Sequence, residues 1–406
     1  MEYIKTINNF DFRNQTALIR VDFNVPVNEN HQITDNTRIK YSIPTIQKIL
    51  YEKGKIVLIS HFGRPKGKIS EIYSLKFIVP FLSKELKTDV LFFENCIGKD
   101  VEKKVHQLKN GEILLLENLR FYKEEEEENE HFAFELSKLG DIYVNDAFGV
   151  SHRLHTSITI LPKFFGEKKC IGFLMKKEIQ NINKFLSKKG KKPITFLLGG
   201  AKISSKIEII ENIIDIADHL LIGGGMAFPF IKINGGKVGD SIVEYNKIIK
   251  IENTLKKILD QKKNKINILS FPKDVVISKS FKKTSNTKIV PIYSIPDGWM
   301  GLDIGPSSIK YFCNIIEKSK TIFWNGPVGV FEISNFSLGT KSIIKTIAKT
   351  TEKGSFSLIG GGDSIASLKM VKGCKEKISY LSTGGGAMLE SLKNKILPGI
   401  KAIINT

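Results

Sequence analysis

Arginine is rare in this 406-residue chain, and its positions indicate where a planar cationic side chain is needed. Only six of the 62 basic residues are arginines, and all six lie in the first 153 residues. A guanidinium can hold a phosphate or a carboxylate through two parallel hydrogen bonds, whereas lysine supplies a point charge. Four of the six stand beside the ends of strand-like runs: Arg38, Arg64, Arg120 and Arg153. This pattern predicts a site for a small anion in the N-terminal half.

Polar side chains end four apolar runs of that half. The segments are RVDFNVP at residues 20–26, HFGRP at 61–65, LENLRF at 116–121, and NDAFG with SHR at 145–149 and 151–153. One arginine or histidine in such a place is more often a surface or structural residue. Four strand ends that together supply arginine, histidine, asparagine and aspartate favour a binding site, because the carboxyl ends of parallel strands meet at one edge of a sheet. A small acid that carries hydroxyl and phosphate groups fits this set.

Glycine-rich or glycine-containing turns follow five strand-like runs in the C-terminal half. They lie at residues 199–202, 223–225, 325–327, 360–364 and 383–386. Glycine lets backbone N–H groups approach a ligand closely, and a following helix N-terminus favours an anion, so five such turns predict a second anion site. No GxxxxGK[ST] motif occurs, and these turns do not match GxGxxG. P-loop, nicotinamide and flavin proteins are therefore disfavoured.

Two acidic features are candidates for metal binding. Asp363 follows three glycines at the start of a predicted helix, where it is either an N-cap or a ligand of a nucleotide-bound Mg²⁺. Residues 124–128 are five consecutive glutamates. Five adjacent carboxylates cannot converge on one ion, so we expect a solvated loop or helix start there.

Composition limits the class of protein. The length predicts two domains, and 41 % apolar with 26 % charged residues is typical of a soluble globular chain. No apolar run is long enough to cross a membrane, and the N-terminus lacks the pattern of a secretory signal. Four widely spaced cysteines without zinc-ligand spacing predict free thiols in a reducing cytoplasm.

The net charge of +20 has two interpretations. It could mark a nucleic-acid-binding protein, or it could reflect a lysine-rich solvated surface. We favour the second, because the lysines are dispersed, are not interleaved with aromatic residues on one element, and have no arginine beside them in the second half. Retention on polyanions at low salt is still expected.

Short apolar runs alternate with longer amphipathic segments, which predicts an α/β fold with parallel sheets covered on both faces. We predict strands at residues 16–21, 55–60, 113–116, 142–145, 193–198, 219–222, 267–270, 321–324, 355–359 and 378–381. We predict helices at 37–53, 74–86, 129–139, 204–216, 341–349 and 364–372. A polar helical pattern at 176–189, which ends in a run of Lys, Gly and Pro, indicates a domain boundary near 171–192.

Ten ordered motifs together give a resemblance to the phosphoglycerate kinase family over essentially the whole chain. Four are the N-terminal motifs described above. The others are GGAKISSK (199–206), IGGGMAF (222–228), DIGP (303–306), WNGPVGVFE (324–332), GGGDS (360–364) and STGGGA (382–387). Departures from the family pattern are Ser151, Leu154, Ser364, Met388 and the abundance of lysine. None of the departures replaces a charged residue of the inferred site.

The resemblance implies two doubly wound α/β domains with parallel six-stranded sheets, joined by a hinge helix. Residues 1–171, with a C-terminal return at about 387–406, would bind 3-phosphoglycerate or 1,3-bisphosphoglycerate. Residues 172–192 would form the hinge helix and linker, and residues 193–386 would bind ADP or ATP with Mg²⁺. The implied reaction is reversible phosphoryl transfer between 1,3-bisphosphoglycerate and ADP in glycolysis. The implied protein is a cytoplasmic monomer without a membrane or specific nucleic-acid partner.

The resemblance also implies roles for residues of the matching motifs. The acid-substrate site would comprise Asp22, Phe23, Asn24, Arg38, His61, Phe62, Gly63, Arg64, Arg120 and Arg153. The nucleotide site would comprise Gly200, Lys202, Gly224, Asn325, Pro327, Glu332, Gly361, Gly362, Asp363 and Ser364. Glu332 would hold the ribose hydroxyls, and Asp363 would serve the Mg²⁺.

The expected chemistry needs alignment and charge stabilisation, because the transition state of phosphoryl transfer is loose. The acceptor is anionic in either direction, so no general base is required. We expect Arg38 and Lys206 to approach the transferring group from opposite domains. Backbone N–H groups of Gly362 and of Gly385 or Gly386, together with Mg²⁺, would complete the charge clamp. Since neither half holds the whole set, hinge closure should assemble the site.

Two other classes of function stay open from the residues alone. A two-domain small-molecule binding protein would have the same two sites without turnover, although the GGGDS turn disfavours it. A nucleic-acid-binding protein would use the net charge, and a steep salt dependence would support it.

Overall fold

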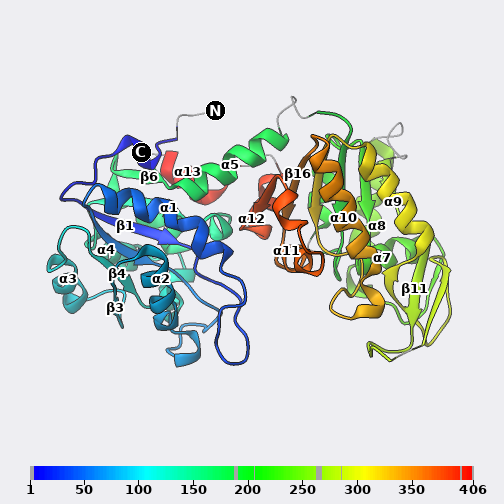
Figure 1. Ribbon diagram of the computed structural model, residues 1–406, viewed down its shortest axis with the longest axis horizontal. Helices are drawn as coiled ribbons and strands as arrows, with labels where there is room; N and C mark the ends of the chain where they lie inside the picture. Colours follow the sequence, from blue (N-terminus) through cyan, green and yellow to red (C-terminus); the bar gives the residue numbers. More distant parts are fainter. Residues whose placement is uncertain are drawn as a thin grey trace. The chain divides into compact units, whose positions relative to one another are not determined.

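The computed structural model describes residues 4–186, 191–204, 206–261, 268–284, 286–393 and 396–404. Contacts within the chain divide it into two compact units. Unit 1 comprises Met1–Gln180 and Lys395–Thr406, and unit 2 comprises Asn181–Asn394. Each unit is built around one six-stranded sheet (Figure 1).

Unit 1 contains a parallel sheet with the strand order β3-β4-β2-β1-β5-β6. Its strands are β1 Thr16–Val21, β2 Lys55–Ile59, β3 Val90–Phe93, β4 Ile113–Leu116, β5 Ile142–Asp146 and β6 Lys169–Ile171. Its helices are α1 Thr37–Tyr51, α2 Val79–Leu86, α3 Lys99–His106, α4 Glu130–Ser137 and α13 Pro398–Ile404, the last beside β6 (Figure 1). Strands β1 and β4 are buried along their whole length, as expected for a sheet covered on both faces.

The register of unit 1 brings the ends of its central strands to one edge. Arg20 near the end of β1 pairs with Ile59 of β2 and with Asn145 of β5. Leu58 of β2 pairs with Leu115 of β4. The polar segments that follow these four strands therefore emerge side by side.

Unit 2 contains a parallel sheet with the order β10-β8-β7-β15-β16-β17. Its strands are β7 Ile194–Leu198, β8 His219–Ile222, β10 Leu269–Ser270, β15 Thr321–Asn325, β16 Phe356–Gly360 and β17 Tyr380–Ser382. Its helices are α6 Ile207–Ile213, α7 Ala227–Ile233, α8 Ile248–Gln261, α9 Pro306–Lys318, α10 Leu338–Glu352, α11 Gly362–Ser367 and α12 Gly385–Ser391. Leu198 pairs with both Ile222 and Asn325, so the glycine turns after β7, β8 and β15 also share one edge.

A small antiparallel sheet adds to unit 2, in the order β12-β11-β14. It consists of β11 Asp274–Ser278, β12 Thr287–Pro291 and β14 Met300–Ile304, and β11 packs beside α9 (Figure 1). A two-stranded parallel pair, β9 Lys237–Val238 and β13 Ser294–Ile295, accompanies it. No strand was predicted between residues 271 and 320, so the three strands of this sheet were not expected from the sequence.

The predicted fold class is confirmed, because each unit holds one parallel six-stranded sheet. The strands predicted at 16–21, 113–116 and 219–222 have the observed bounds. Strands β3 and β6 were not predicted, since both are short segments at the sheet edges. In the strand predicted at 267–270, residue 267 lies outside the described residues, as do residues 187–190 of the predicted linker.

Asp146, the last residue of β5, is wholly buried at the N-terminal end of α5 (Phe173–Leu186). Its Oδ1 accepts a hydrogen bond from the backbone N–H of Met175 at 3.1 Å, and the Thr45 hydroxyl also bonds to the carboxyl group. Its Oδ2 has no hydrogen-bond partner among the described residues. Burial outweighs these hydrogen bonds and raises the pKa of Asp146 to about 7.

We expect Asp146→Asn to gain stability relative to the wild type as the pH rises. A carboxyl group with a pKa of about 7 in the folded protein and about 4 in the unfolded chain stabilises the fold below the lower value. This stabilisation falls as the pH rises above the pKa of the unfolded chain, and it is gone once the pH has passed the folded-state pKa of about 7. Asparagine can still accept from Met175 and does not titrate. Between about pH 5 and about pH 8, the free energy of unfolding of the variant minus that of the wild type should rise by on the order of 2 kcal/mol. A difference in urea unfolding that is constant with pH would contradict this role.

Candidate active site

The residues after β1 meet the first turn of α1 in unit 1. Arg38 Nη1 donates to Oδ1 of Asp22 at 3.2 Å and to the backbone carbonyl of Asn24 at 2.7 Å. Asp22 is buried, whereas 30 % of the Arg38 side chain is exposed. The guanidinium is therefore fixed at one end and still accessible to a ligand.

His61, which follows β2, is buried beside the same carboxylate. Its Nε2 lies 4.0 Å from Asp22 Oδ1, and its Nδ1 lies 3.2 Å from Nη2 of Arg20. Burial, with the neighbouring Arg20 guanidinium, lowers the pKa of His61 well below its usual value. The imidazole is therefore neutral around pH 7.

The HFGRP turn joins this group through backbone contacts. The N–H of Gly63 donates to Oδ1 of Asn24 at 3.0 Å, and Nη1 of Arg120 donates to the Gly63 carbonyl at 2.7 Å. Arg120 also forms an ion pair with Glu126 at 3.2 Å. The structure thus brings together most of the polar residues that the sequence analysis assigned to an acid-substrate site.

The remaining members of that set differ in exposure. The side chains of Arg64 and Arg153 are exposed, and within the described part of the chain neither forms an ion pair. Phe23 and Phe62 are buried in the core, and their backbone N–H groups already donate to Ser60 Oγ and to Asn118 Oδ1. The two arginines are therefore available to a ligand, whereas the two phenylalanine rings pack in the hydrophobic core next to the site.

The expectation that residues 124–128 form a solvated run is wrong at Glu125. This carboxylate is fully buried, and it accepts hydrogen bonds from the backbone N–H and the hydroxyl of Ser157. Its Oε1 lies 3.7 Å from Nη2 of Arg20, which is also fully buried. The charge of Arg20, which lies within the apolar β1, required a buried partner, and this requirement was the signal that could have singled out Glu125.

Lys206 occupies the edge of the unit 2 sheet just before α6. Its Nζ donates to the carbonyls of Gly199 at 2.7 Å and Asn325 at 3.1 Å. Burial lowers the pKa of Lys206 to about 8, and the carboxylate of Asp363 opposes this shift. Gly326 has a φ of +99°, and a Cβ there would lie 2.9 Å from the ammonium and 2.2 Å from the Gly199 carbonyl oxygen. Position 326 therefore requires glycine, because a side chain there would displace the Gly199 carbonyl or the Lys206 ammonium.

Asn325 and Ser364 join neighbouring turns of unit 2. Nδ2 of Asn325 donates to the Gly360 carbonyl at 2.8 Å, and Oγ of Ser364 accepts from the N–H of Gly326 at 2.6 Å. Ser364 is fully buried. Ser364, a departure from the family pattern, thus uses its hydroxyl within the turn. Met388 is also fully buried, against Gly360.

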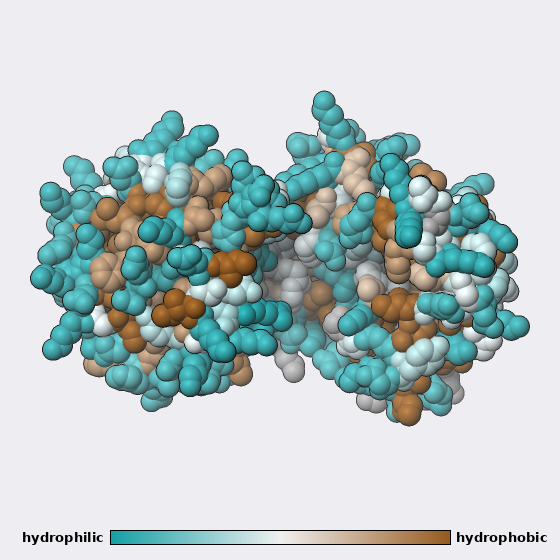
Figure 2. Space-filling model, turned by 90° about the horizontal axis from the view of Figure 1, so that it is seen from below, coloured by the Kyte–Doolittle hydropathy of each residue, from teal (hydrophilic) through white to brown (hydrophobic). Residues whose placement is uncertain are grey.

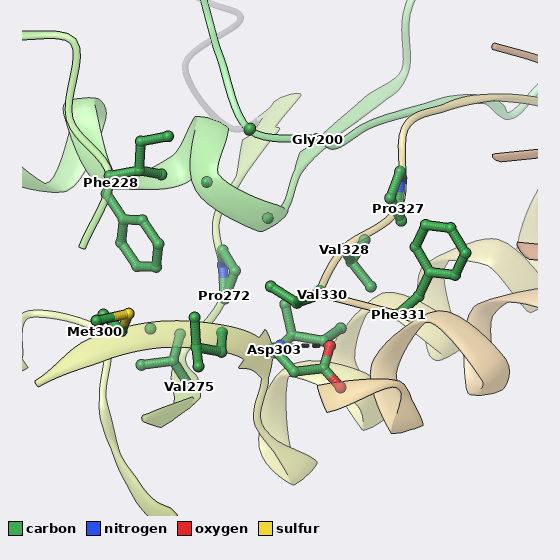
Figure 3. Close-up of a pocket in the computed structure, with 18 of the residues that line it drawn as sticks. Gly200, Phe228, Pro272, Val275, Met300, Asp303, Pro327, Val328, Val330 and Phe331 are labelled. Carbon is green, nitrogen blue, oxygen red and sulfur yellow. Dashed lines mark hydrogen bonds between the residues drawn. The ribbon is translucent and has the colours of Figure 1, made fainter. Parts of the chain in front are cut away.

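A pocket of about 540 Å³ lies at this edge of unit 2. Five residues predicted for the nucleotide site line it: Gly200, Gly224, Pro327, Glu332 and Asp363. Apolar side chains form much of the remaining wall, as Figure 3 shows for Phe228, Val275, Met300, Val328, Val330 and Phe331. Lys202 is exposed and is not among the lining residues. A pocket with an apolar wall and a glycine-lined edge suits a planar base joined to phosphate groups.

The apolar wall is the part of this pocket that sequence reasoning missed. Val275 lies on β11, and Met300 and Leu302 lie on β14 of the unpredicted antiparallel sheet. The β-branched run at 275–277 was an available signal for β11. Asp303 of β14 accepts from the backbone N–H of Gly339 at 2.8 Å and so joins the pocket wall to α10.

A nucleotide-bound Mg²⁺ fits the residues at this edge. Asp363 is exposed, lies in the first turn of α11 and lines the pocket. Mg²⁺ keeps several waters and is usually held by one or two carboxylates together with substrate phosphates. Within the described residues, no group of three or more His, Cys, Asp or Glu side chains could hold a metal ion. A single exposed carboxylate at this glycine-lined edge is compatible with a Mg²⁺ that arrives with its nucleotide.

The net charge is distributed unevenly along the chain. Residues 181–394 contain 33 lysines against 17 aspartates and glutamates, whereas the rest is nearly balanced. Figure 2 shows hydrophilic residues spread over the visible face of each unit. Most of the net positive charge thus belongs to residues 181–394. In the part of the chain that the structure describes, no helix combines the length and apolar character that a membrane span requires.

Comparison with known proteins gives the same result at every level. The family model described as "Phosphoglycerate kinase" matches residues 7–395. "Phosphoglycerate kinase 3, cytosolic" of Arabidopsis thaliana is 45 % identical over 400 residues, which is 98 % of either chain. "Phosphoglycerate kinase" of Porphyromonas gingivalis is 44 % identical over 98 % of this chain and 99 % of that one. The solved phosphoglycerate kinases of Coxiella burnetii and Pyrococcus horikoshii superpose with TM-scores of 0.83 and 0.84, at 32 % and 31 % identity over at least 98 % of each chain.

Proposed function

Since the chain belongs to the phosphoglycerate kinase family, we propose that unit 1 binds the acid substrate and that the pocket of unit 2 binds the nucleotide. The chain is a kinase that catalyses reversible phosphoryl transfer between 1,3-bisphosphoglycerate and ADP, giving 3-phosphoglycerate and ATP in glycolysis. A binding protein without turnover is therefore not its function. The site assignment rests on the observation that unit 1 has an arginine-rich strand edge and unit 2 has a glycine-lined apolar pocket.

In unit 1, we assign the carboxylate and hydroxyl groups of the acid to the region around Asp22, Asn24 and His61. These side chains supply both donors and acceptors, as a hydroxy acid requires. The remote phosphate would be held by Arg64, Arg120 and Arg153, because the first and the last are exposed and Arg120 donates to the carbonyl of Gly63, next to Arg64. Arg38 would face the group that is transferred.

In unit 2, the base would lie against the apolar wall and the phosphates along the glycine turns. Glu332 lines the pocket and would accept from the ribose hydroxyls. The turns at Gly224 and Gly361 would offer backbone N–H groups to the phosphates. The N–H of Gly200 already donates to the Pro327 carbonyl at 2.8 Å, so Gly200 would contribute a close approach of its backbone. Asp363 would hold the Mg²⁺, which neutralises phosphate charge when it is bound.

Transfer in this arrangement needs no general base, because both acceptors are anionic. Arg38 and Lys206 would stabilise the charge on the equatorial oxygens, together with the N–H groups of Gly362 and of Gly385 or Gly386. Arg38 belongs to unit 1 and the others to unit 2. We therefore propose that closure about residues 172–192 brings the two groups to the same phosphoryl group and excludes water.

The oligomeric state, location and partners of the enzyme are also part of the proposal. We propose that it acts as a monomer in the cytoplasm, with small-molecule partners and no specific nucleic acid. The relative from Arabidopsis is named as cytosolic, and the lysines of unit 2 are dispersed along its sequence.

A coupled assay tests the proposed sites together. The purified chain is mixed with ATP, Mg²⁺ and 3-phosphoglycerate, and a dehydrogenase consumes the 1,3-bisphosphoglycerate while the loss of NADH is followed. Turnover should require all three components. Turnover that persists without Mg²⁺, after chelation, would contradict the role assigned to Asp363.

A further inference from the structure

Arg20 is a buried cation that the proposed function does not use directly. It lies in the middle strand β1, and its side chain is fully buried. Its Nε donates to Oγ of Ser157 at 2.8 Å, its Nη1 donates to the carbonyl of Val21, and its Nη2 lies 3.2 Å from Nδ1 of His61. Three separate groups of the protein therefore surround and hold the guanidinium.

Glu125 and Ser157 hold this guanidinium in place. Oε1 of Glu125 accepts from the Ser157 hydroxyl at 2.6 Å, and Oε2 accepts from the Ser157 backbone N–H at 2.9 Å. The same carboxylate lies 3.7 Å from Arg20 Nη2 and compensates its charge. Because breaking one side of a buried pair leaves an uncompensated charge, the guanidinium cannot easily leave this position.

The contact with His61 determines where the imidazole proton lies. A guanidinium has five donors and no acceptor, and it does not lose its proton in proteins. A ring nitrogen 3.2 Å from Nη2 must therefore accept, so Nδ1 carries no proton. In the neutral ring the proton is then on Nε2, the nitrogen that faces the Asp22 carboxylate at 4.0 Å.

Charged groups around the ring act in the same direction. Arg20, Arg38 and Arg120 all disfavour an imidazolium, as does His155, and burial disfavours it most. Asp22 is the opposing anion, and it is already paired with Arg38 at 3.2 Å. A chain of contacts therefore runs from Glu125 through Arg20 and His61 to Asp22.

We propose that Arg20 is a positioning residue which, held by Glu125 and Ser157, fixes His61 as the neutral Nε2–H tautomer. The ring then presents a hydrogen-bond donor without a charge on the side of Asp22. The consequence for substrate rests on the proposed function, in which this side of His61 meets the acid. The tautomer itself is a property of the free protein and does not depend on that assignment.

Nitrogen-15 NMR of selectively labelled histidine in the full chain tests the tautomer without substrate. We expect His61 to show a bare Nδ1 and a protonated Nε2 throughout the range from about pH 5 to about pH 8, in which an ordinary histidine titrates. A proton on Nδ1, or on both nitrogens within that range, would overturn the proposal. Because this measurement uses the wild type, it stands even if a variant fails to fold.

Arg20→Lys tests the positioning role, with Arg13→Lys as a matched control. Arg13 is exposed in the same unit and pairs with Asp11. A lysine cannot serve Ser157, Val21 and His61 in one plane. In Arg20→Lys we expect mixed tautomers or a titration of His61, and a KM for 3-phosphoglycerate raised about tenfold, the scale of one hydrogen bond to a charged group. The control should match the wild type in both readouts.

The outcomes separate this inference from the proposed function. Arg20→Lys with an unchanged His61 tautomer and an unchanged KM would overturn the positioning role. A wild type that shows the expected tautomer but binds no 3-phosphoglycerate at unit 1 would contradict the proposed site and leave the tautomer assignment supported.

Discussion

Replacement of Arg38 by alanine is expected to lower kcat by on the order of 10³-fold, the scale of an arginine supplied to a transferring phosphoryl group. The guanidinium is anchored by Asp22 and by the Asn24 carbonyl, yet part of it is exposed. An anchored cation is already oriented when charge develops, so its loss is felt in the transition state more than in the ground state. The measurement is steady-state kinetics in the coupled assay, with both substrates saturating.

Arg13→Ala is the control for this change, because Arg13 is an exposed arginine of the same unit. It should leave kcat within twofold of the wild type, about the range of an ordinary surface substitution. A loss of less than about tenfold in Arg38→Ala would remove Arg38 from the role assigned to it. A loss confined to KM would give it a uniform binding role instead.

Replacement of Lys206 by methionine should lower kcat by on the order of 10²- to 10³-fold, the scale of one preorganised donor in a transition-state site. Methionine keeps much of the length of the side chain and removes the ammonium that lies on the Gly199 and Asn325 carbonyls. The pKa of Lys206 is about 8, so in the free enzyme the ammonium is lost as the pH rises through that value. The kcat/KM for the nucleotide in the wild type should therefore fall above about pH 8.

Lys232→Met provides the matched control, because Lys232 is an exposed lysine in the last turn of α7. It should keep both the rate and the pH profile of the wild type. If Lys206→Met retained the high-pH decline, the titrating group would be another residue. If it retained more than about a tenth of the wild-type kcat, Lys206 would not act on the transferring group.

The placement of the polar strand ends was predictable because of a general property of parallel sheets. Segments that follow neighbouring parallel strands emerge at one edge, so the ends of β1, β2, β4 and β5 had to meet once the strands were recognised. The start of α1 at Thr37 was predicted as well, and it places Arg38 in the first turn. The glycine turns of unit 2 followed from the same reasoning.

Side-chain direction was not predictable from the motifs. Phe23 and Phe62 stand within the same motifs as Asp22 and His61, but their rings pack among the apolar side chains of the unit 1 core. Sequence adjacency cannot separate a residue that faces a ligand from one that faces the interior, because that depends on the backbone beyond the strand end. Among the acidic run, Glu125 differs from its neighbours only through its contact with Arg20 and Ser157. Its contact with Arg20 joins residues more than a hundred positions apart, and its contact with Ser157 joins residues 32 positions apart.

The apolar pocket wall was missed for a different reason. Strands β11, β12 and β14 are short and antiparallel, and they interrupt the strand–helix alternation on which the analysis relied. Their pairing is set by non-local contacts, which local periodicity does not record. The glycine turns therefore predicted a phosphate site, whereas the apolar wall that we propose for the base could be found only in the structure.

The central claim is that charges from two units act on one phosphoryl group, and small-angle scattering tests it most directly. The radius of gyration is measured for the free protein, with each substrate alone, and with 3-phosphoglycerate and Mg²⁺–nucleotide together. We expect compaction that is largest with both present, because only then are Arg38 and Lys206 both engaged. An unchanged radius in the ternary mixture, under conditions where the coupled assay shows full turnover, would contradict the account.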